Sequence, residues 1–217
     1  MLPTVSAVLQ TLLAEAASGR LFHNLGVTMV RVAWAFALAM LLGSALGIAM
    51  GRLPRLDQVL DSLLTFLLNL PALVGIVLIF VWFGLSEATV IAAVAINKLP
   101  STAVTMREGA RAVDDRLVEM AQSFEVPRLR IWREVILPQL TPYFFASARS
   151  GLALIWKIVL VAELLGRSDG VGFQIEVYFQ LFDVTGILAY TLAFMIVVQT
   201  IEWALLQPLA RRANRWR

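Results

Sequence analysis

The sequence predicts an all-α membrane protein with about five transmembrane helices, an N-terminal amphipathic helix and a cytoplasmic helical hairpin. Of its 217 residues, 59% are apolar and 15% are charged, whereas about a quarter of an ordinary soluble domain is charged. No charged residue lies between Asp61 and Glu87, and about 20 apolar residues suffice to cross a bilayer. Lipid offers backbone amides no hydrogen-bond partner, so each span must be helical.

Residues 1–20 are predicted to form an amphipathic helix on the outer membrane surface, separate from a single transmembrane domain over residues 21–217. Ser6, Gln10 and Glu15 share one helical face, and Gly19 is placed to stop the helix. The opposite face carries Val5, Val8, Leu9, Leu12, Leu13 and Ala16.

Five segments have the length and composition of membrane spans. They are residues 26–50, 62–86, 88–106, 140–165 and 184–209. Pro71, after Asn69, is expected to kink the second span. The third span is the weakest, because it holds Lys98 and Pro100, and we expect a short, interrupted helix there.

The positions of the arginines orient the chain. Twelve arginines lie in three segments that share one side of an alternating topology, against two on the other side. The positive-inside rule therefore puts the N-terminus outside and the C-terminus in the cytoplasm. The cytoplasmic set is Arg52, Arg55, Arg107, Arg111, Arg116, Arg128, Arg130, Arg133, Arg211, Arg212, Arg215 and Arg217, and the outer pair is Arg20 and Arg167.

The longest polar excursion, residues 107–138, carries six basic and six acidic side chains, so nucleic acid is not the indicated partner. Two apolar stripes predict two short amphipathic helices with a break near Glu125, the first capped by Asp114. The stripes are Val113, Leu117, Met120, Ala121 and Phe124, then Leu129, Trp132, Val135 and Ile136. The pattern alone leaves open whether these helices merely cover the bundle or dock a cytoplasmic partner.

Glu119-Met120-Ala121, followed after three residues by Glu125 and after nine more by residues 135–138, resembles the EAA signature of permease subunits of bacterial ABC importers. Further segments resemble the nitrate, sulfonate and taurine members of that family: Arg31-Val32 with Phe36, Pro71, Trp82-Phe83-Gly84, Ala162-Glu163, Gly170-Val171-Gly172 and the terminal Arg-Trp. Such permeases usually carry one more membrane helix ahead of the segment that matches residues 1–20. A shortened start and a five-span variant are both open.

The resemblance implies a type I importer fold, in which residues 107–138 are the coupling region that docks on an ATP-binding subunit. It assigns coupling to Glu119, Met120, Ala121, Gln122, Ser123, Phe124, Glu125, Val135, Leu137 and Pro138. Glu125 stands where the signature has glycine. A positive φ there costs a non-glycine residue on the order of 1 kcal/mol, so either the turn is built differently or that cost is accepted.

The resemblance also implies partners: a second permease subunit, two ABC ATP-binding subunits carrying ATP and Mg²⁺, and an extracytoplasmic solute-binding protein. The expected location is the bacterial inner membrane, in contact with lipid. The solute would be a small anion such as a sulfonate, taurine or nitrate. The alternative is a secondary transporter or channel with an unrelated regulatory hairpin.

Ionised side chains inside a membrane are costly and are usually paired or face a cavity. Lys157 could draw an anion into the path, or it could form an ion pair with Glu163 or with a neighbouring subunit. Lys98 is either structural or path-lining, and Asn69 joins both lysines as a candidate path residue beside Pro71. For Arg149 and Glu202, near the inner ends of their spans, we favour snorkelling or pairing over contact with solute.

Gly43, Gly47 and Gly51 form two GxxxG steps on one face of the first span, which predicts close helix packing within a subunit or across a dimer. No catalytic or cofactor site is expected. The chain lacks a phosphate-binding P-loop, has one histidine and no cysteine, and has neither HExxH nor GxSxG, so no metal or enzyme site is predicted.

Overall fold

The computed structural model describes residues 3–206, which are almost entirely helical. In chain order the helices are α1 (Val5–Ala17), α2 (Arg20–Arg52), α3 (Pro54–Asn69), α4 (Ala72–Phe83), α5 (Glu87–Arg111), α6 (Asp115–Ser123), α7 (Arg128–Ile131), α8 (Leu137–Gly166), α9 (Val171–Gln180) and α10 (Val184–Ile201). π-helical turns at Trp132–Ile136 and Glu202–Leu206 follow α7 and α10. The end of the last predicted span and the tail arginines lie outside the described residues.

Within residues 3–206, four helices are long and apolar enough to cross a membrane, in agreement with four of the predicted spans. The segment predicted as a kinked second span is instead two helices, α3 and α4, bent by 102° relative to each other. The chain leaves helical geometry at Leu70 and Pro71, where proline removes a backbone donor and disfavours helix at the residue before it. The described part of the chain thus contains five candidate spans only if this bent pair counts as one.

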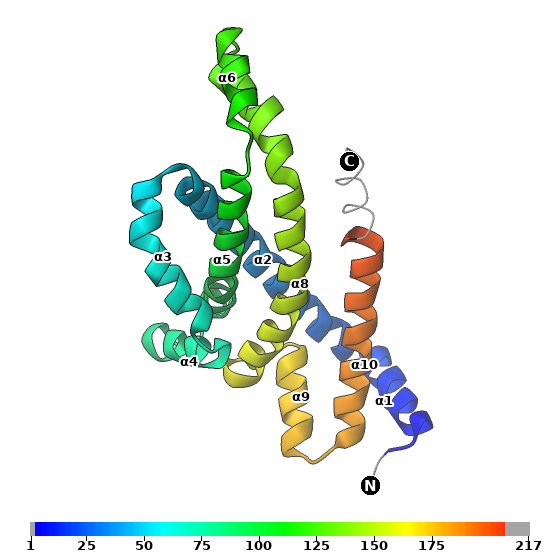
Figure 1. The fold of residues 1–217 in the computed structure, drawn as a ribbon. Helices are drawn as coiled ribbons and strands as arrows, with labels where there is room; N and C mark the ends of the chain where they lie inside the picture. The colour runs from blue at the N-terminus through cyan, green and yellow to red at the C-terminus, as the bar shows by residue number, and fades with distance from the viewer. Residues whose placement is uncertain (1–2, 207–217) are drawn as a thin grey trace.

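α5 corrects a second expectation, because it is one continuous helix of 25 residues rather than an interrupted one. Pro100 is buried inside it, and α5 packs between α2 and α8 (Figure 1). Packing on both sides outweighs the local cost of a proline in a helix.

The three glycines of the first span face α5 of the same chain. A Cβ at Gly47 would lie 2.2 Å from the Ala103 carbonyl oxygen, and one at Gly43 would lie 2.7 Å from Thr102 Cβ. A Cβ at Gly51 would lie 2.6 Å from Ala110 Cβ. The structure therefore uses this face for packing within the subunit, the first of the two alternatives.

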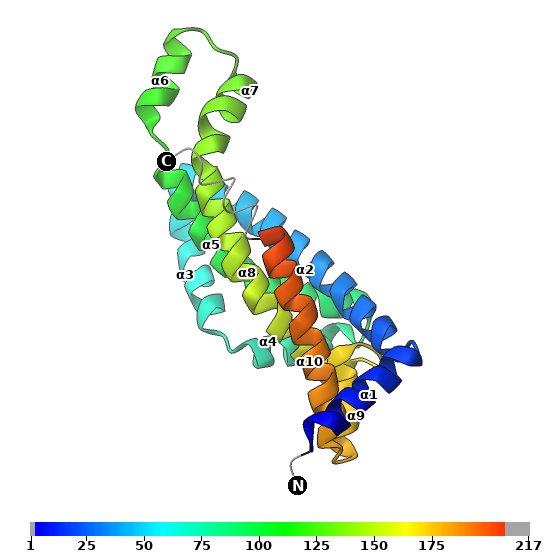
Figure 2. The ribbon, with the colours of Figure 1, turned by 90° about the vertical axis from the view of Figure 1, so that its right-hand side faces the viewer.

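Residues 107–138, predicted to be cytoplasmic, form a hairpin that projects from one end of the bundle (Figure 2). α6 is the expected short helix, and the Asp114 side chain accepts a hydrogen bond from Arg116 N. The second arm of the hairpin is helical, but it is not the separate short helix that was predicted. α7, the π-helical turn and α8 form a continuous helical segment from Arg128 to Gly166.

The opposite end of the bundle holds two shorter helices beside α10 (Figure 1). One is α9, a helix within the segment predicted only as an outer loop, residues 166–183. The other is α1, which is helical as predicted but has a different buried face. Glu15, predicted on the polar face, is buried and accepts a hydrogen bond from the Tyr190 hydroxyl at 2.9 Å, whereas Leu13 is exposed.

Candidate functional site

The hairpin tip is an exposed apolar surface. Phe124 is 77% exposed and Leu129 is 82% exposed, and Leu117, Met120 and Trp132 are also exposed. Below the tip, the hairpin is fixed to the bundle by a buried cluster of Met106, Ala110, Val113, Ala121, Ile131, Ile136 and Leu140. The apolar residues of the two predicted stripes therefore form two groups. The buried ones anchor the hairpin to the bundle, and the others are exposed at its tip.

The turn between α6 and α7 ends the helix with a Schellman motif. Val126 N donates to Ala121 O at 3.1 Å, and Glu125 N donates to Gln122 O at 2.9 Å. Glu125 lies in the left-handed region with φ of 53°. The position thus has the conformation that the signature glycine favours, and this chain accepts the cost of a side chain there.

The remaining coupling candidates surround this turn. Glu119, Gln122 and Ser123 are exposed on α6, and Ala121 is buried against the anchoring cluster. Leu137 and Pro138 are exposed at the start of α8, and Val135 is half-buried. Two polar contacts fix the start of α6 to the bundle. Arg52 Nη1 donates to Asp115 Oδ1 at 2.8 Å, and Asp114 N donates to Gln139 Oε1 at 2.9 Å.

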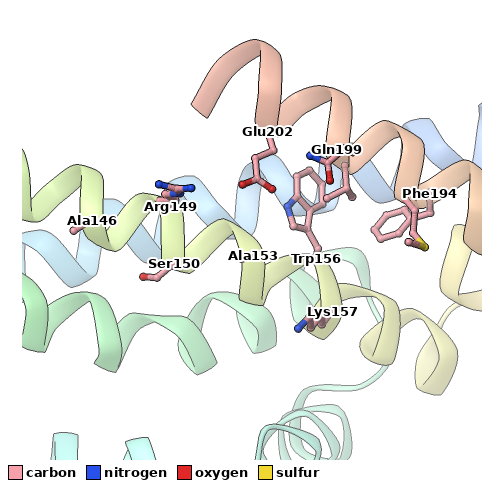
Figure 3. Close-up of a pocket in the computed structure, with 11 residues that line it drawn as sticks. Ala146, Arg149, Ser150, Ala153, Trp156, Lys157, Phe194, Gln199 and Glu202 are labelled. Carbon is pink, nitrogen blue, oxygen red and sulfur yellow. The ribbon is translucent and has the colours of Figure 1, made fainter. Parts of the chain in front are cut away.

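A cavity of about 640 Å³ lies between α8 and α10, a size typical of small-molecule sites. Five of its lining residues are polar or charged: Arg149, Ser150, Lys157, Gln199 and Glu202 (Figure 3). Trp156 and Phe194 form part of the apolar wall, and their rings meet edge to face. In the view of Figure 3, Lys157 and Glu202 lie on opposite sides of α8.

The three predicted path residues are not brought together. Lys157 lines the cavity between α8 and α10, but Lys98 is buried where α5 meets Gly151 of α8, and its Nζ donates to Ser101 Oγ at 2.6 Å. Asn69 lies at the end of α3, and its amide donates to Thr65 O at 2.8 Å. The charged residues that join Lys157 in the cavity are Arg149 and Glu202, for which snorkelling or pairing was expected.

Glu163 does not pair with Lys157, the alternative considered from sequence. Its carboxylate is fully buried and lies 2.7 Å from Arg31 Nη1. Arg31 also contacts Glu87 and Asp169, each at 2.5 Å, and Arg167 contacts Glu87 at 2.5 Å. This network joins α2, α5, α8 and the loop before α9.

Sequence reasoning missed the network, although one signal was available. Arg31 is a charged residue inside a predicted span, and such residues nearly always have a partner. Within the loop, partial burial alone would raise the pKa of Asp169, but the hydrogen bond and charge of Arg31 outweigh burial and lower that pKa below its usual value.

Comparison with known proteins agrees with this architecture. The family model for the binding-protein-dependent transport system inner membrane component matches residues 39–205. SsuC of Bacillus subtilis (strain 168), a permease protein named for aliphatic sulfonates transport, is 30% identical over 217 residues, covering 100% of this chain and 78% of its own. The taurine transport system permease protein TauC of Escherichia coli (strain K12) is 28% identical over 220 residues, covering 99% of this chain and 80% of its own.

The fold is also that of solved transporters. The crystal structure of an amino acid ABC transporter with histidines superposes with a TM-score of 0.74 at 19% identity, covering 98% of this chain and 100% of that chain. The family match covers most of the chain and identifies it as a transport permease, and the superposition shows that it also has the fold of such a subunit. The chain belongs to the family of binding-protein-dependent transport system inner membrane components, the permeases of ABC importers.

Proposed function

We propose that this permease works in a pair of permease subunits, each of which docks on an ABC ATP-binding subunit through its hairpin. The observation that carries the proposal is the exposed apolar tip on a rigidly anchored hairpin. Phe124 and Leu129 can fill an apolar groove, and the charges around them can set the register of the contact. ATP and Mg²⁺ would bind to the partner subunits and not to this chain.

The orientation follows from the same assignment. The hairpin lies in the cytoplasm, so α9 and α1, at the other end of the bundle, face the outside. An extracytoplasmic binding protein would deliver its solute at the exposed residues of the outer segment 166–183 and at the N-terminal helix. The arginine distribution supports this orientation independently.

The solute would be a small anion. Support comes from the cavity between α8 and α10, where Lys157 and Arg149 place two cationic groups on α8 against one carboxylate, that of Glu202. Charged side chains that face lipid are costly, which favours placing this face of α8 on the translocation path. Relatives named for sulfonates and taurine support the same class of solute.

The docking step is tested by replacing both tip residues, Phe124→Asp with Leu129→Asp, and measuring co-purification with the ATP-binding subunit. We expect co-purification to be lost because a carboxylate cannot enter an apolar groove without a partner. Phe182→Asp is the matched control. Phe182 is 88% exposed at the outer end, so this variant should still assemble. Normal assembly of the double variant would refute the docking proposal.

A further inference from the structure

The first turn of α9 is held by buried side chains from two other helices. Gly170 N donates to Asn24 Oδ1, Val171 N donates to Thr28 Oγ1 and Gly172 N donates to Glu163 Oε2, each at 2.9 Å. The first amides of a helix have no partner within the helix. Here each of the three is satisfied, so moving α9 away would leave buried polar groups unpaired.

Backbone contact makes this junction tight. A Cβ at Gly172 would lie 2.2 Å from the Leu160 carbonyl oxygen, and a Cβ at Gly170 would lie 2.5 Å from the Glu163 carboxylate. Gly170 also has a φ of 102°, which other residues rarely adopt. α9 therefore approaches α8 as closely as two backbones can, and glycine is required for that approach.

The Glu163 carboxylate is held from its other side as well. Thr28 Oγ1 donates to both of its oxygens at 2.9 Å, and Arg31 pairs with it at 2.7 Å. We call the whole set the outer clasp: Asn24, Thr28, Arg31, Glu87, Glu163, Asp169, Gly170 and Gly172. The outer clasp fixes α9 to α8, α2 and α5.

At its other end, the α8 helix runs without a break into the hairpin. The segment Arg128–Gly166 is 39 residues long, and Figures 1 and 2 show it passing from the hairpin, of which it forms one arm, to the start of α9. Glu163 lies three residues before the end of this segment. One helical rod thus joins the cytoplasmic hairpin to the outer clasp.

We propose that the outer clasp makes α9 a rigid extension of α8, so that the outer helix and the cytoplasmic hairpin move as one body during transport. Glu163, Arg31 and Gly172 act as positioning residues in this arrangement. The inference rests on the proposed docking of the hairpin to an ATP-binding subunit, because that subunit supplies the movement. It provides a mechanical route by which events at the outer surface and at the ATP sites are linked across the membrane.

The test measures the separation between the hairpin and the outer helix α9. The chain contains no cysteine, so Arg116→Cys on α6 and Gln180→Cys on α9 introduce the only two sites for spin labels. The labelled chain, diluted with unlabelled copies, is assembled with its ATP-binding subunits in lipid nanodiscs. Electron–electron double resonance then gives the distance distribution without nucleotide and with ADP–vanadate.

We expect one narrow distribution, unchanged by nucleotide, in the otherwise native chain. In Gly172→Ala, which wedges α9 off α8 without changing a charge, the distribution should broaden and shift with nucleotide. Glu163→Gln should have the same effect through weaker hydrogen bonds. Gly26→Ala is the matched control, because a Cβ at Gly26 meets nothing within 4 Å, and it should behave like the native chain.

Two results would overturn the inference: a distance in the native chain that changes with nucleotide, or clasp variants that both match the native chain. A single label at residue 116 separates this failure from failure of the proposed function. If its mobility does not respond to the ATP-binding subunits at all, the docking proposal falls and the inference falls with it. If it responds while the distance fails as described, only the rigid extension is refuted.

Discussion

Glu163 and Arg31 form a buried ion pair, with 2.7 Å between Glu163 Oε1 and Arg31 Nη1, although 132 residues separate them in the chain. Their environments are unequal. Arg31 is the only cation that contacts Glu163 within the described residues, whereas Arg31 retains Glu87 and Asp169 when Glu163 is neutralised. This asymmetry leads to a prediction about stability.

Arg31→Met should destabilise the chain by roughly 3–5 kcal/mol, because it leaves a buried carboxylate without a cation. Glu163→Gln should cost only about 1–2 kcal/mol, since an amide can still accept from Thr28 and since Arg31 keeps two partners. Unfolding of the purified chain in detergent, followed by tryptophan fluorescence, measures both. Equal losses, or a larger loss for Glu163→Gln, would contradict the asymmetry.

Asp169 predicts how the outer clasp responds to acid. Its pKa in the fold is lowered, against the effect of burial, by the Arg31 guanidinium. A lowered pKa means that the ionised form is favoured by folding, so this stabilisation is present above the ordinary pKa of about 3.8 and is lost as pH falls through the lower value in the fold.

The measurement is the melting temperature of the native chain and of Asp169→Asn as a function of pH. We expect a constant difference between the two from pH 7 down to about pH 4.5, and convergence at lower pH as Asp169 becomes protonated. A difference that is unchanged down to about pH 2 would show that Asp169 contributes nothing through its charge.

Glu125→Gly should stabilise the hairpin by up to about 1 kcal/mol, because the φ of 53° is unfavourable for glutamate. Ser123→Gly, two residues earlier in α6, should act in the opposite direction by roughly 0.5 kcal/mol, since glycine lowers helix stability there. Limited proteolysis of the hairpin in the purified chain measures both changes. Two changes of the same sign would refute the assignment of this turn.

Local patterns predicted the elements that depend on local physics. The apolar segments predicted four long helices, Asp114 capped α6 as expected, and the glycine position of the signature located the left-handed residue at Glu125. Proline was harder to interpret, because its effect depends on tertiary packing. Pro71, at the break before α4, accompanies a 102° bend, whereas Pro100 is absorbed inside α5 between two neighbouring helices.

Contacts between distant residues could not be read from periodicity. Arg31 meets carboxylates 56, 132 and 138 residues away, and no local pattern encodes which acidic residue reaches it. For the same reason Lys157 and Lys98, both lysines inside predicted spans, were grouped from sequence although one lines a cavity and the other is buried between α5 and α8.

Replacing glycine by alanine in α2 should have different effects on stability at a packed and at an open position. Gly47→Ala should cost roughly 1–3 kcal/mol, because its Cβ would lie 2.2 Å from the Ala103 carbonyl oxygen and would force α2 away from α5. Gly26→Ala, in the same helix but facing open space, should be neutral or should stabilise by up to about 1 kcal/mol. Thermal unfolding in detergent distinguishes them. Equal effects would mean that α2 and α5 do not pack as described.

The two lysines allow a direct test of the anion path. Lys157→Met should lower uptake of radiolabelled taurine or alkanesulfonates by about tenfold to a hundredfold, because a charge-assisted contact with an anion is worth about 1.5–3 kcal/mol. Lys98→Met removes the same charge from a site that does not line the cavity, so uptake should persist. Both variants should still co-purify with the ATP-binding subunit, which separates a defect in the path from a defect in assembly. If Lys157→Met transports as well as the native chain, α8 does not present this lysine to the solute, and the cavity it lines serves another purpose.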